Sequence, residues 1–249
     1  MKYLITLICL AIATIGRGQD QDNFDKATTL YQKGDYTQAA AVYSSILKSG
    51  KESSALYYNL GNTYYKLNNV PESIYYYEKA LQLDPENADA KNNLIFANQM
   101  KVDAITPLPK TWVRQLSDGI VGLFRAHTWA VLSIIGVFAF VLNFLLYYFV
   151  ERTGLKRTFF SLMLVFLFFA IGSYTLAHFC HKQVSQTQYA ILFDKTVRVF
   201  SDANAYSSEV MQLHEGTKVE IIEDAKDWVK IRLVNGKTGW TKVNSLRKL

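Results

Sequence analysis

Two long stretches of the chain contain no charged side chain, and they constrain its fold more than any other feature. They run from Thr128 to Val150 and from Thr158 to Ala177. Each supplies about the 20 apolar residues that a helix needs to cross roughly 30 Å of hydrocarbon with its backbone groups bonded internally. We therefore predict a transmembrane hairpin over residues 128–180, with a loop from Glu151 to Arg157.

The start of the chain predicts the orientation of this hairpin. Residues 1–18 contain Lys2, an apolar run and the small residues Gly16 and Gly18, which together are typical of a cleaved signal peptide. An uncleaved anchor is the alternative. Export from Gln19 onward would leave the basic loop in the cytoplasm, as the positive-inside rule prefers. The loop's basic residues are Arg152, Lys156 and Arg157. We expect a bacterial inner-membrane protein with both flanking domains in the periplasm.

Composition agrees with polar domains joined to a few apolar spans. Half of the residues are hydrophobic, yet the mean hydropathy is only +0.02, which is too low for a transporter with many helices. The net charge of +6 is also divided along the chain. Residues 19–110 carry nine Lys against eleven Asp and Glu, while residues 182–249 carry eleven basic and eight acidic side chains. Neither region has the charge of a nucleic-acid-binding surface, although the second suits anionic lipid headgroups.

A 34-residue repeat organises the region from residue 19 to residue 103. The chain aligns with itself at that offset, which is the tetratricopeptide length. The residues of the second copy that resemble the family pattern are Tyr57, Leu60, Gly61, Tyr64, Ser73, Tyr77, Ala80, Leu81 and Pro85. Gly61 and Ala80 are small where two helices must cross closely. We predict an all-α solenoid of two repeats, closed by a capping helix from about Glu86 to Met100.

The resemblance implies a concave groove that binds peptides, lined by the first helices of successive repeats. The positions carried over are Thr28, Tyr31, Tyr58, Asn62, Tyr65, Lys66 and Asn92. Packing or surface roles for these tyrosines are an equal alternative. The family's pattern for clamping a terminal carboxylate is incomplete, because Phe24 and Thr28 occupy positions where Lys and Asn are expected.

A linker from residue 104 to residue 127 precedes the first span. Its apolar residues, beginning at Trp112, recur at helical spacing with polar residues between them. Such a helix can lie in the headgroup layer with its tryptophan at the interface. The alternative is a helix packed on the hairpin.

Three histidines and a cysteine lie near the outer ends of the spans, and all are competent metal ligands. They are His127, His178, His181 and Cys180. No second motif fixes a coordination set, so we expect no metal and no cofactor. Neither span holds the buried acid or base that an ion pathway needs. Cys180 also stands alone if Cys9 is removed with the signal peptide.

The C-terminal region, residues 187–249, changes to short strands with turn signals. Five strands are predicted, over 189–193, 196–200, 217–223, 227–233 and 237–243, with a tight hairpin at Asn235 and Gly236, which can both adopt positive φ. Five strands in about 60 residues indicate a small all-β barrel. The segments 213–219, 228–231 and 235–240 resemble the bacterial SH3 type. We expect its core to be separate from that of the repeats.

The SH3 resemblance implies binding of peptides or cell-wall components without catalysis. Trp228 and Trp240 are the candidate ligand-binding residues of the barrel, although Trp240 could equally belong to its core. Arrangements of Ser, His and Asp, of Cys and His, or of paired carboxylates are missing from this region. We therefore expect no enzyme activity.

The order of signal peptide, repeats, hairpin and SH3-type domain resembles the BatE proteins of the Bacteroides aerotolerance group. The resemblance implies a membrane-bound partner of other Bat proteins, some with von Willebrand factor type A domains and associated with a MoxR-type ATPase. We therefore predict a non-enzymatic scaffold that binds protein partners and the lipid bilayer, in a complex concerned with envelope or oxidative stress. A sensor that binds peptidoglycan is the alternative.

Overall fold

The structure, a computed structural model, describes residues 21–249, with no description of the side chains of residues 183–186. The predicted signal peptide, residues 1–18, therefore lies outside the described residues. The chain forms two compact units. The repeat-barrel unit combines Met1–Pro107 with Gln188–Leu249, and the hairpin unit is Leu108–Thr187.

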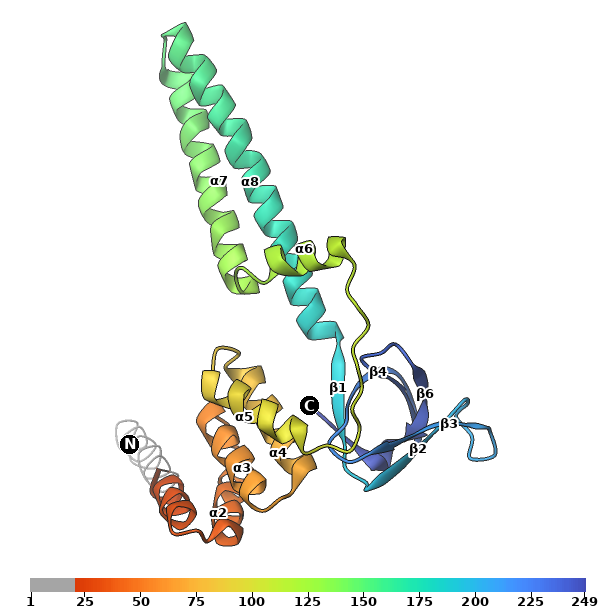
Figure 1. The fold of residues 1–249 in the computed structure, drawn as a ribbon. Coiled ribbons are helices and arrows are strands. Elements are labelled where there is room, and N and C mark those ends of the chain that lie inside the picture. Colours follow the sequence, from red (N-terminus) through yellow and green to blue (C-terminus); the bar gives the residue numbers. More distant parts are fainter. Residues whose placement is uncertain (1–20) are drawn as a thin grey trace, which may run out of the picture. The chain divides into compact units, whose positions relative to one another are not determined.

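The repeat region is entirely helical, as its 34-residue period predicts (Figure 1). Residues 21–32 form a helix in the described part of the chain. The helices that follow are α2 (Tyr36–Lys48), α3 (Ser54–Lys66), α4 (Val70–Leu83) and α5 (Ala88–Gln99). From α2 onward, each begins after a polar residue whose side chain accepts a hydrogen bond from the backbone N–H three residues later, which satisfies an end of the helix. These capping residues are Asp35, Ser53, Asn69 and Asn87.

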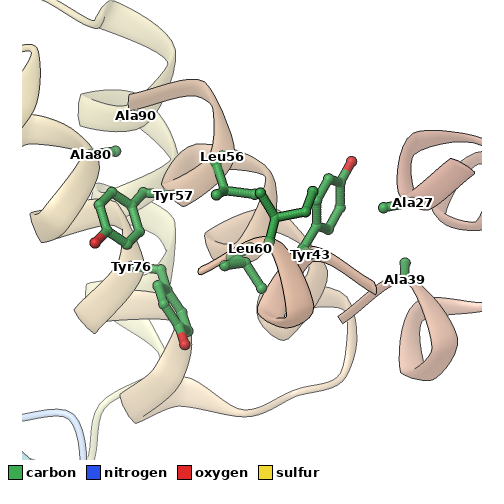
Figure 2. Close-up of a cluster of buried hydrophobic side chains, with 10 residues drawn as sticks. Ala27, Ala39, Tyr43, Leu56, Tyr57, Leu60, Tyr76, Ala80 and Ala90 are labelled. Atoms are coloured by element: carbon green, nitrogen blue, oxygen red, sulfur yellow. The ribbon is translucent and has the colours of Figure 1, made fainter. Parts of the chain in front are cut away.

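Large tyrosine and leucine side chains fill the core of the repeats, and alanines allow their helices to approach (Figure 2). Tyr43 and Leu60 are fully buried among the alanines of neighbouring helices. Gly61 is the tightest position, since an added Cβ would lie 2.5 Å from Cδ1 of Tyr77. The structure thus confirms that this glycine permits a close helix crossing.

The C-terminal region is an antiparallel sheet of seven strands in the order β3-β2-β6-β5-β4-β1-β7. The strands are β1 (Gln188–Leu192), β2 (Thr196–Phe200), β3 (Glu209–His214), β4 (Lys218–Ala225), β5 (Trp228–Arg232), β6 (Thr238–Lys242) and β7 (Leu246–Lys248). The prediction of five strands missed β3 and β7. Both end the strand order, where a strand needs fewer buried side chains and its apolar alternation is weaker. Buried residues of β1, β2, β3, β4 and β5 form one apolar core.

The turn between β5 and β6 differs from the predicted tight hairpin. Only Gly236 has a positive φ, +81°, and its N–H donates to the carbonyl of Leu233 at 2.9 Å. Asn235 instead accepts a hydrogen bond at its side chain from the N–H of Lys237. The turn therefore spans residues 233–237. Residues 233–236 form a four-residue turn that ends in the left-handed Gly236, in place of a two-residue loop. The predicted tight hairpin at Asn235 and Gly236 is thus a longer turn in which only the glycine uses a positive φ.

The hairpin unit contains three helices, α6 (Trp112–Val121), α7 (Ala126–Phe149) and α8 (Thr153–Gln186). Both α7 and the segment Thr153–Lys182 are long and apolar enough to cross a membrane. The predicted loop over residues 151–157 is too long, because α8 begins at Thr153 and includes Lys156, whose ammonium lies 5.6 Å from the ring centre of Tyr147. Leu, Lys and Arg favour helix, so the basic residues continue α8 rather than form a loop.

Small residues bring α7 and α8 together. An added Cβ at Gly136 would lie 3.1 Å from the Cβ of Ala170, whereas one at Gly172 would meet nothing within 4 Å. Ser133 donates a hydrogen bond from Oγ to the carbonyl of Ala170 at 3.0 Å. Only Gly136 of the two span glycines therefore mediates helix packing in the hairpin, in the way that small residues allow close contact in membranes.

Candidate functional site

A cavity of about 300 Å³ opens on the repeat region. Helix α3 contributes four of its lining residues, because positions three and four apart share one face of a helix. The residues that line it are Tyr31, Tyr58, Asn62, Tyr65, Lys66, Tyr77, Asn93 and Phe96. Lys66 is the only one of these eight with a charged side chain at neutral pH. The remaining surface consists of aromatic rings, hydroxyls and amides, which suits an uncharged or acidic segment of a polypeptide.

A chain of hydrogen bonds fixes the polar side chains of this cavity. The hydroxyl of Tyr77 donates to Oδ1 of Asn62 at 2.7 Å, and Nδ2 of Asn93 donates to the same oxygen at 2.8 Å. Nδ2 of Asn93 also lies 3.3 Å from the hydroxyl of Tyr58. Burial raises the pKa of Tyr77 and that of Tyr31, so both phenols stay protonated at neutral pH. The cavity therefore offers neutral hydrogen-bonding groups in a fixed arrangement.

Five of the seven residues predicted for the groove line this cavity, and two do not. Thr28 donates to the carbonyl of Phe24 and shares a hydrogen bond of 2.9 Å with the hydroxyl of Tyr43. Asn92 is exposed on α5, whereas its neighbour Asn93 lines the cavity. The structure places Thr28 and Asn92 outside the lining of this cavity, which does not support their predicted role in peptide binding.

Sequence reasoning missed Tyr77, Asn93 and Phe96. The spacing of α5 held a usable signal, because Asn93 is three residues after the buried Ala90 and four before the buried Ala97. That face of the capping helix must point at the preceding repeat. Tyr77 belongs to the repeat pattern, and the structure shows it both buried, at 1% exposed, and in the lining of the cavity.

The predicted barrel residues Trp228 and Trp240 lie on strands β5 and β6 and are both half-buried. Trp228 packs its ring edge against Phe200 with ring centres 5.6 Å apart, and Phe200 pairs with Trp240 across the sheet. The Lys230 ammonium lies 5.6 Å from the ring centre of Trp240. Trp228 also lines a second cavity of about 490 Å³, and Trp240 does not. The two tryptophans are thus neighbours on one face of the sheet, and of the two only Trp228 lines this cavity.

The repeats and the barrel each have a core of their own, but a third apolar cluster joins them, which the expectation of separate cores did not include. Ile191 of β1 is fully buried together with Ile74 and Tyr77 of α4 and with Ala97 of α5. Phe193 lies in the same cluster and meets Tyr75 edge-on with ring centres 6.0 Å apart. Apolar residues exposed on an isolated repeat array are covered here by the barrel.

Ion pairs surround this shared cluster. Lys218 of β4 bonds to Glu78 of α4 at 2.7 Å. Arg247 of β7 pairs with Glu72 at 2.6 Å, and its guanidinium lies 4.1 Å from the ring centre of Tyr75. These pairs are partly shielded from solvent, which makes them stronger than fully exposed ones.

Asp103 forms the most connected polar contact between the repeats and the barrel. Its carboxylate accepts hydrogen bonds from the backbone N–H of His214 and the hydroxyl of Thr217, both at 2.7 Å. Nδ1 of His214 lies 2.8 Å from its other oxygen. Burial alone would raise the pKa of Asp103, but the hydrogen bonds from His214 and Thr217 outweigh it and hold the pKa below its ordinary value.

The histidines near the spans do not gather into a site in the described part of the chain. His127, His178 and His181 are exposed, and Cys180 is buried with its Sγ 3.6 Å from the carbonyl of Val121. Among residues 21–249, no three His, Cys, Asp or Glu side chains lie close enough to hold a metal ion.

Comparison with known families agrees with this architecture. Residues 24–88 match the tetratricopeptide repeat, and residues 195–245 match the bacterial SH3 domain. The chain carries both modules and two apolar helices. A search of curated proteins finds no match. The two modules are typically non-catalytic binding domains, so they indicate a scaffold that binds proteins or peptidoglycan, and the apolar helices indicate membrane association.

Proposed function

We propose that this protein is a membrane-tethered, extracytoplasmic scaffold whose repeat groove binds an extended segment of a protein partner. The observation that carries the proposal is the cavity between the repeats and the capping helix. Its neutral hydrogen-bonding groups are pre-oriented by Asn62 and Asn93, so a bound segment would lose little affinity to ordering of the protein. The aromatic rings around them offer rigid apolar contact area.

The shared cluster of repeats and barrel supports a topology in which both modules lie on one side of the membrane. Two apolar helices, α7 and α8, separate them in the sequence. Two crossings return the chain to its original side. The basic residues Arg152, Lys156 and Arg157 near the turn from α7 to α8, together with the signal-like residues 1–18, favour the extracytoplasmic side.

Cysteine labelling tests this topology. In a Cys180→Ser background, we expect Lys48→Cys and Val234→Cys to react with a membrane-impermeant maleimide in intact cells, and Thr153→Cys to react only after lysis. All three positions are exposed. Labelling of Thr153→Cys alone in intact cells would reverse the proposed orientation.

Capture of partners tests the groove. Phe96→Ala combined with Lys66→Glu removes two exposed parts of the cavity wall and should reduce recovery of partners from solubilised membranes about tenfold or more. Ile95→Ala with Lys91→Glu is a matched control, because both residues are exposed on α5 outside the cavity. Equal recovery of partners with both double variants would show that this groove is not the binding site.

We further propose, on the order of its modules, that the partners are Bat-type membrane proteins in a complex linked to envelope or oxidative stress tolerance. Two weak modules acting on one assembly gain about 10²- to 10⁴-fold in avidity when both can bind at once. Identification by mass spectrometry of the proteins captured by the native chain tests this directly. Recovery without proteins bearing von Willebrand factor type A domains would contradict it.

Binding of peptidoglycan by the barrel is a second candidate, favoured by the aromatic surface of Trp228 in the wall of the 490 Å³ cavity. Sugar rings stack on such surfaces. Sedimentation of the full chain with purified wall material should be lost with Trp228→Ala and retained with Val234→Ala, an exposed residue outside that cavity. Absence of sedimentation by the native chain would leave the barrel a protein-binding module.

A further inference from the structure

A third cavity, of about 480 Å³, lies within the hairpin unit between α6 and the end of α8. Its wall combines basic, hydroxyl and apolar side chains. The residues that line it are Thr111, Val113, Arg114, Ser117, Asp118, Phe179, Lys182 and Thr187. Neither the peptide groove nor the barrel surface includes any of them.

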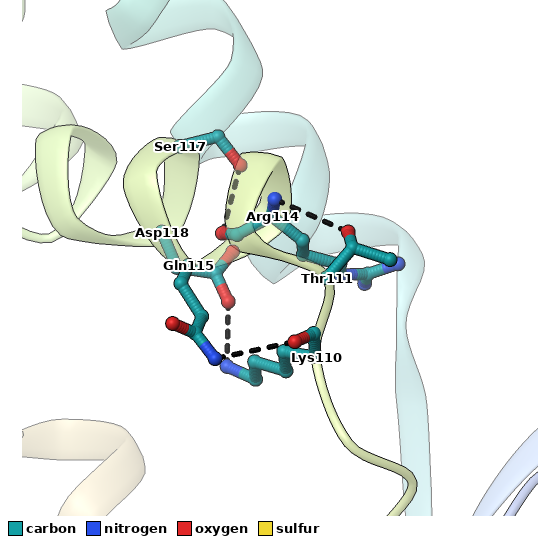
Figure 3. Close-up of polar contacts among 6 residues, drawn as sticks. All are labelled: Lys110, Thr111, Arg114, Gln115, Ser117 and Asp118. Atoms are coloured by element: carbon teal, nitrogen blue, oxygen red, sulfur yellow. Dashed lines mark hydrogen bonds and ion pairs between the residues drawn. The ribbon is translucent and has the colours of Figure 1, made fainter.

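The charges of this cavity are positive in sum. Its one carboxylate, Asp118, accepts a hydrogen bond from the Lys110 ammonium at 2.5 Å, and this bond holds the pKa of Asp118 below its ordinary value (Figure 3). Lys110 thus offsets the acid. The charge of Arg114 also acts on Asp118, but among the described residues neither Arg114 nor Lys182 forms a close ion pair with a carboxylate, so both can still meet an anion.

Hydroxyl groups lie beside these cations. Oγ of Ser117 donates to the carbonyl of Arg114 at 3.0 Å and keeps its lone pairs available (Figure 3). Oγ1 of Thr111 accepts the N–H of Arg114 and keeps its proton available. Val113 and Phe179 complete the wall with apolar surface, each more than half exposed. The cavity thus offers cations, hydroxyl groups and hydrocarbon contact together.

The position of the cavity along the helices indicates the source of its ligand. It lies where the apolar segment of α8 ends, at Lys182, and beside α6, which precedes α7. Helix α6 exposes Trp112, Leu116 and Ile120 along one side, as an interfacial helix does. If α7 and α8 cross a bilayer as proposed, this depth is that of the lipid headgroups, where phosphate, glycerol and the first acyl carbons meet.

We propose that this cavity binds the headgroup of an anionic phospholipid, with Arg114 and Lys182 on the phosphate. Arginine holds phosphate through two parallel N–H donors, and lysine adds a point charge. Thr111 and Ser117 bond the headgroup hydroxyls, which favours phosphatidylglycerol over phosphatidylcholine. Val113 and Phe179 contact the start of an acyl chain. The bound lipid links α6 to α8 and sets the depth of the hairpin in the membrane.

Native mass spectrometry of the full chain in detergent tests the site. Titration with phosphatidylglycerol should show one lipid bound with higher affinity than phosphatidylcholine. Arg114→Gln with Lys182→Gln should weaken that first binding step about 10- to 30-fold, because each basic residue near a lipid surface contributes about 1 kcal/mol. The charge-retaining pair R114K and K182R should keep it, which separates loss of charge from loss of folding.

Arg152→Ala with Arg157→Ala is the matched control, since it removes two exposed cations from the other end of the hairpin. Equal weakening by the control would show general attraction and would overturn the proposal, as would equal binding of phosphatidylcholine. Displacement by inorganic phosphate at equimolar concentration would assign the site to free phosphate instead. The inference rests on the proposed membrane location, which carbonate extraction tests separately: a chain released by carbonate that still binds the lipid would refute only that location.

Discussion

The repeat-barrel unit and the hairpin unit bury opposite kinds of side chain. Tyr43 and Tyr77 are 1% exposed in the repeats, whereas Phe138 and Phe168 of the hairpin are 71% and 70% exposed. The buried residues between α7 and α8 are mostly small, such as Gly136 and Ala170. Water drives large apolar side chains inward, but hydrocarbon solvates them, so close backbone packing is what holds membrane helices together. The same aromatic residues therefore serve as core in one unit and as outer surface in the other.

The largest effect should come from overfilling the aromatic core of the repeats. In Gly61→Val, the new side chain meets the ring of Tyr77, which the shared cluster with the barrel prevents from moving away. We expect a loss of about 3 kcal/mol in the free energy of unfolding of the repeats. Hydrogen exchange of α3 and α4 in the full chain measures it.

Lys66→Val is the control for this change, because it adds a β-branched residue to the same helix at an exposed position. The cost of branching in a helix is a few tenths of a kcal/mol. Similar exchange rates in the two variants would mean that the contact between Gly61 and Tyr77 is not restrictive.

A smaller effect should follow when the barrel loses its hydrogen bonds to the carboxylate of Asp103. In Asp103→Ala, the backbone N–H of His214 and the hydroxyl of Thr217 lose their acceptor, and Thr217 is only 2% exposed. An unsatisfied buried donor costs about 2 kcal/mol. Exchange in β3 and β4 should therefore accelerate, with little change in α7. Unchanged exchange in both strands would show that the apolar cluster alone holds the barrel.

The hairpin should respond less, because α7 and α8 also contact each other away from Gly136, at Trp129 and at Tyr147. Gly136→Leu places a side chain against Ala170 and should cost about 1 to 2 kcal/mol, measured as a lower melting temperature in detergent. Gly172→Leu is the matched control, since its position is open. If both variants melt alike, the helices do not depend on close approach at Gly136.

What the sequence predicted well was local. The repeats and the spans follow from spacing and composition, and five of the seven groove positions line one cavity because a helical face repeats every three to four residues. The prediction named Asn92, whereas Asn93 lines the cavity, which is an error of one residue along α5. Within α5, only the small buried residues Ala90 and Ala97 indicate which face of the helix points inward.

Contacts between segments far apart in the chain left no comparable pattern in the sequence. Asp103 and His214 are 111 residues apart, and the hairpin lies between them in the sequence. Nothing in the pattern of β1 distinguishes Ile191, which packs on the repeats, from Leu192, which packs in the barrel. The strands β3 and β7 were missed for a related reason, since an edge strand is specified by its partner more than by its own alternation.

The smallest expected effect is a pH dependence of the contact between the repeats and the barrel. The pKa of Asp103 is lowered in the folded protein, so its carboxylate stabilises the contact fully above its ordinary pKa of about 3.9, and that stabilisation is lost as pH falls through the lower folded value. We expect exchange of β3 and β4, corrected for its intrinsic pH dependence, to accelerate as the pH falls below about 4. In Asp103→Asn this acceleration should be absent, because the amide does not titrate, while other carboxylates at the same contact, such as Glu78, are unchanged. An equal acid response in the variant would assign the effect to those other carboxylates, and would make the apolar cluster around Ile191, rather than Asp103, the determinant of how the barrel is held.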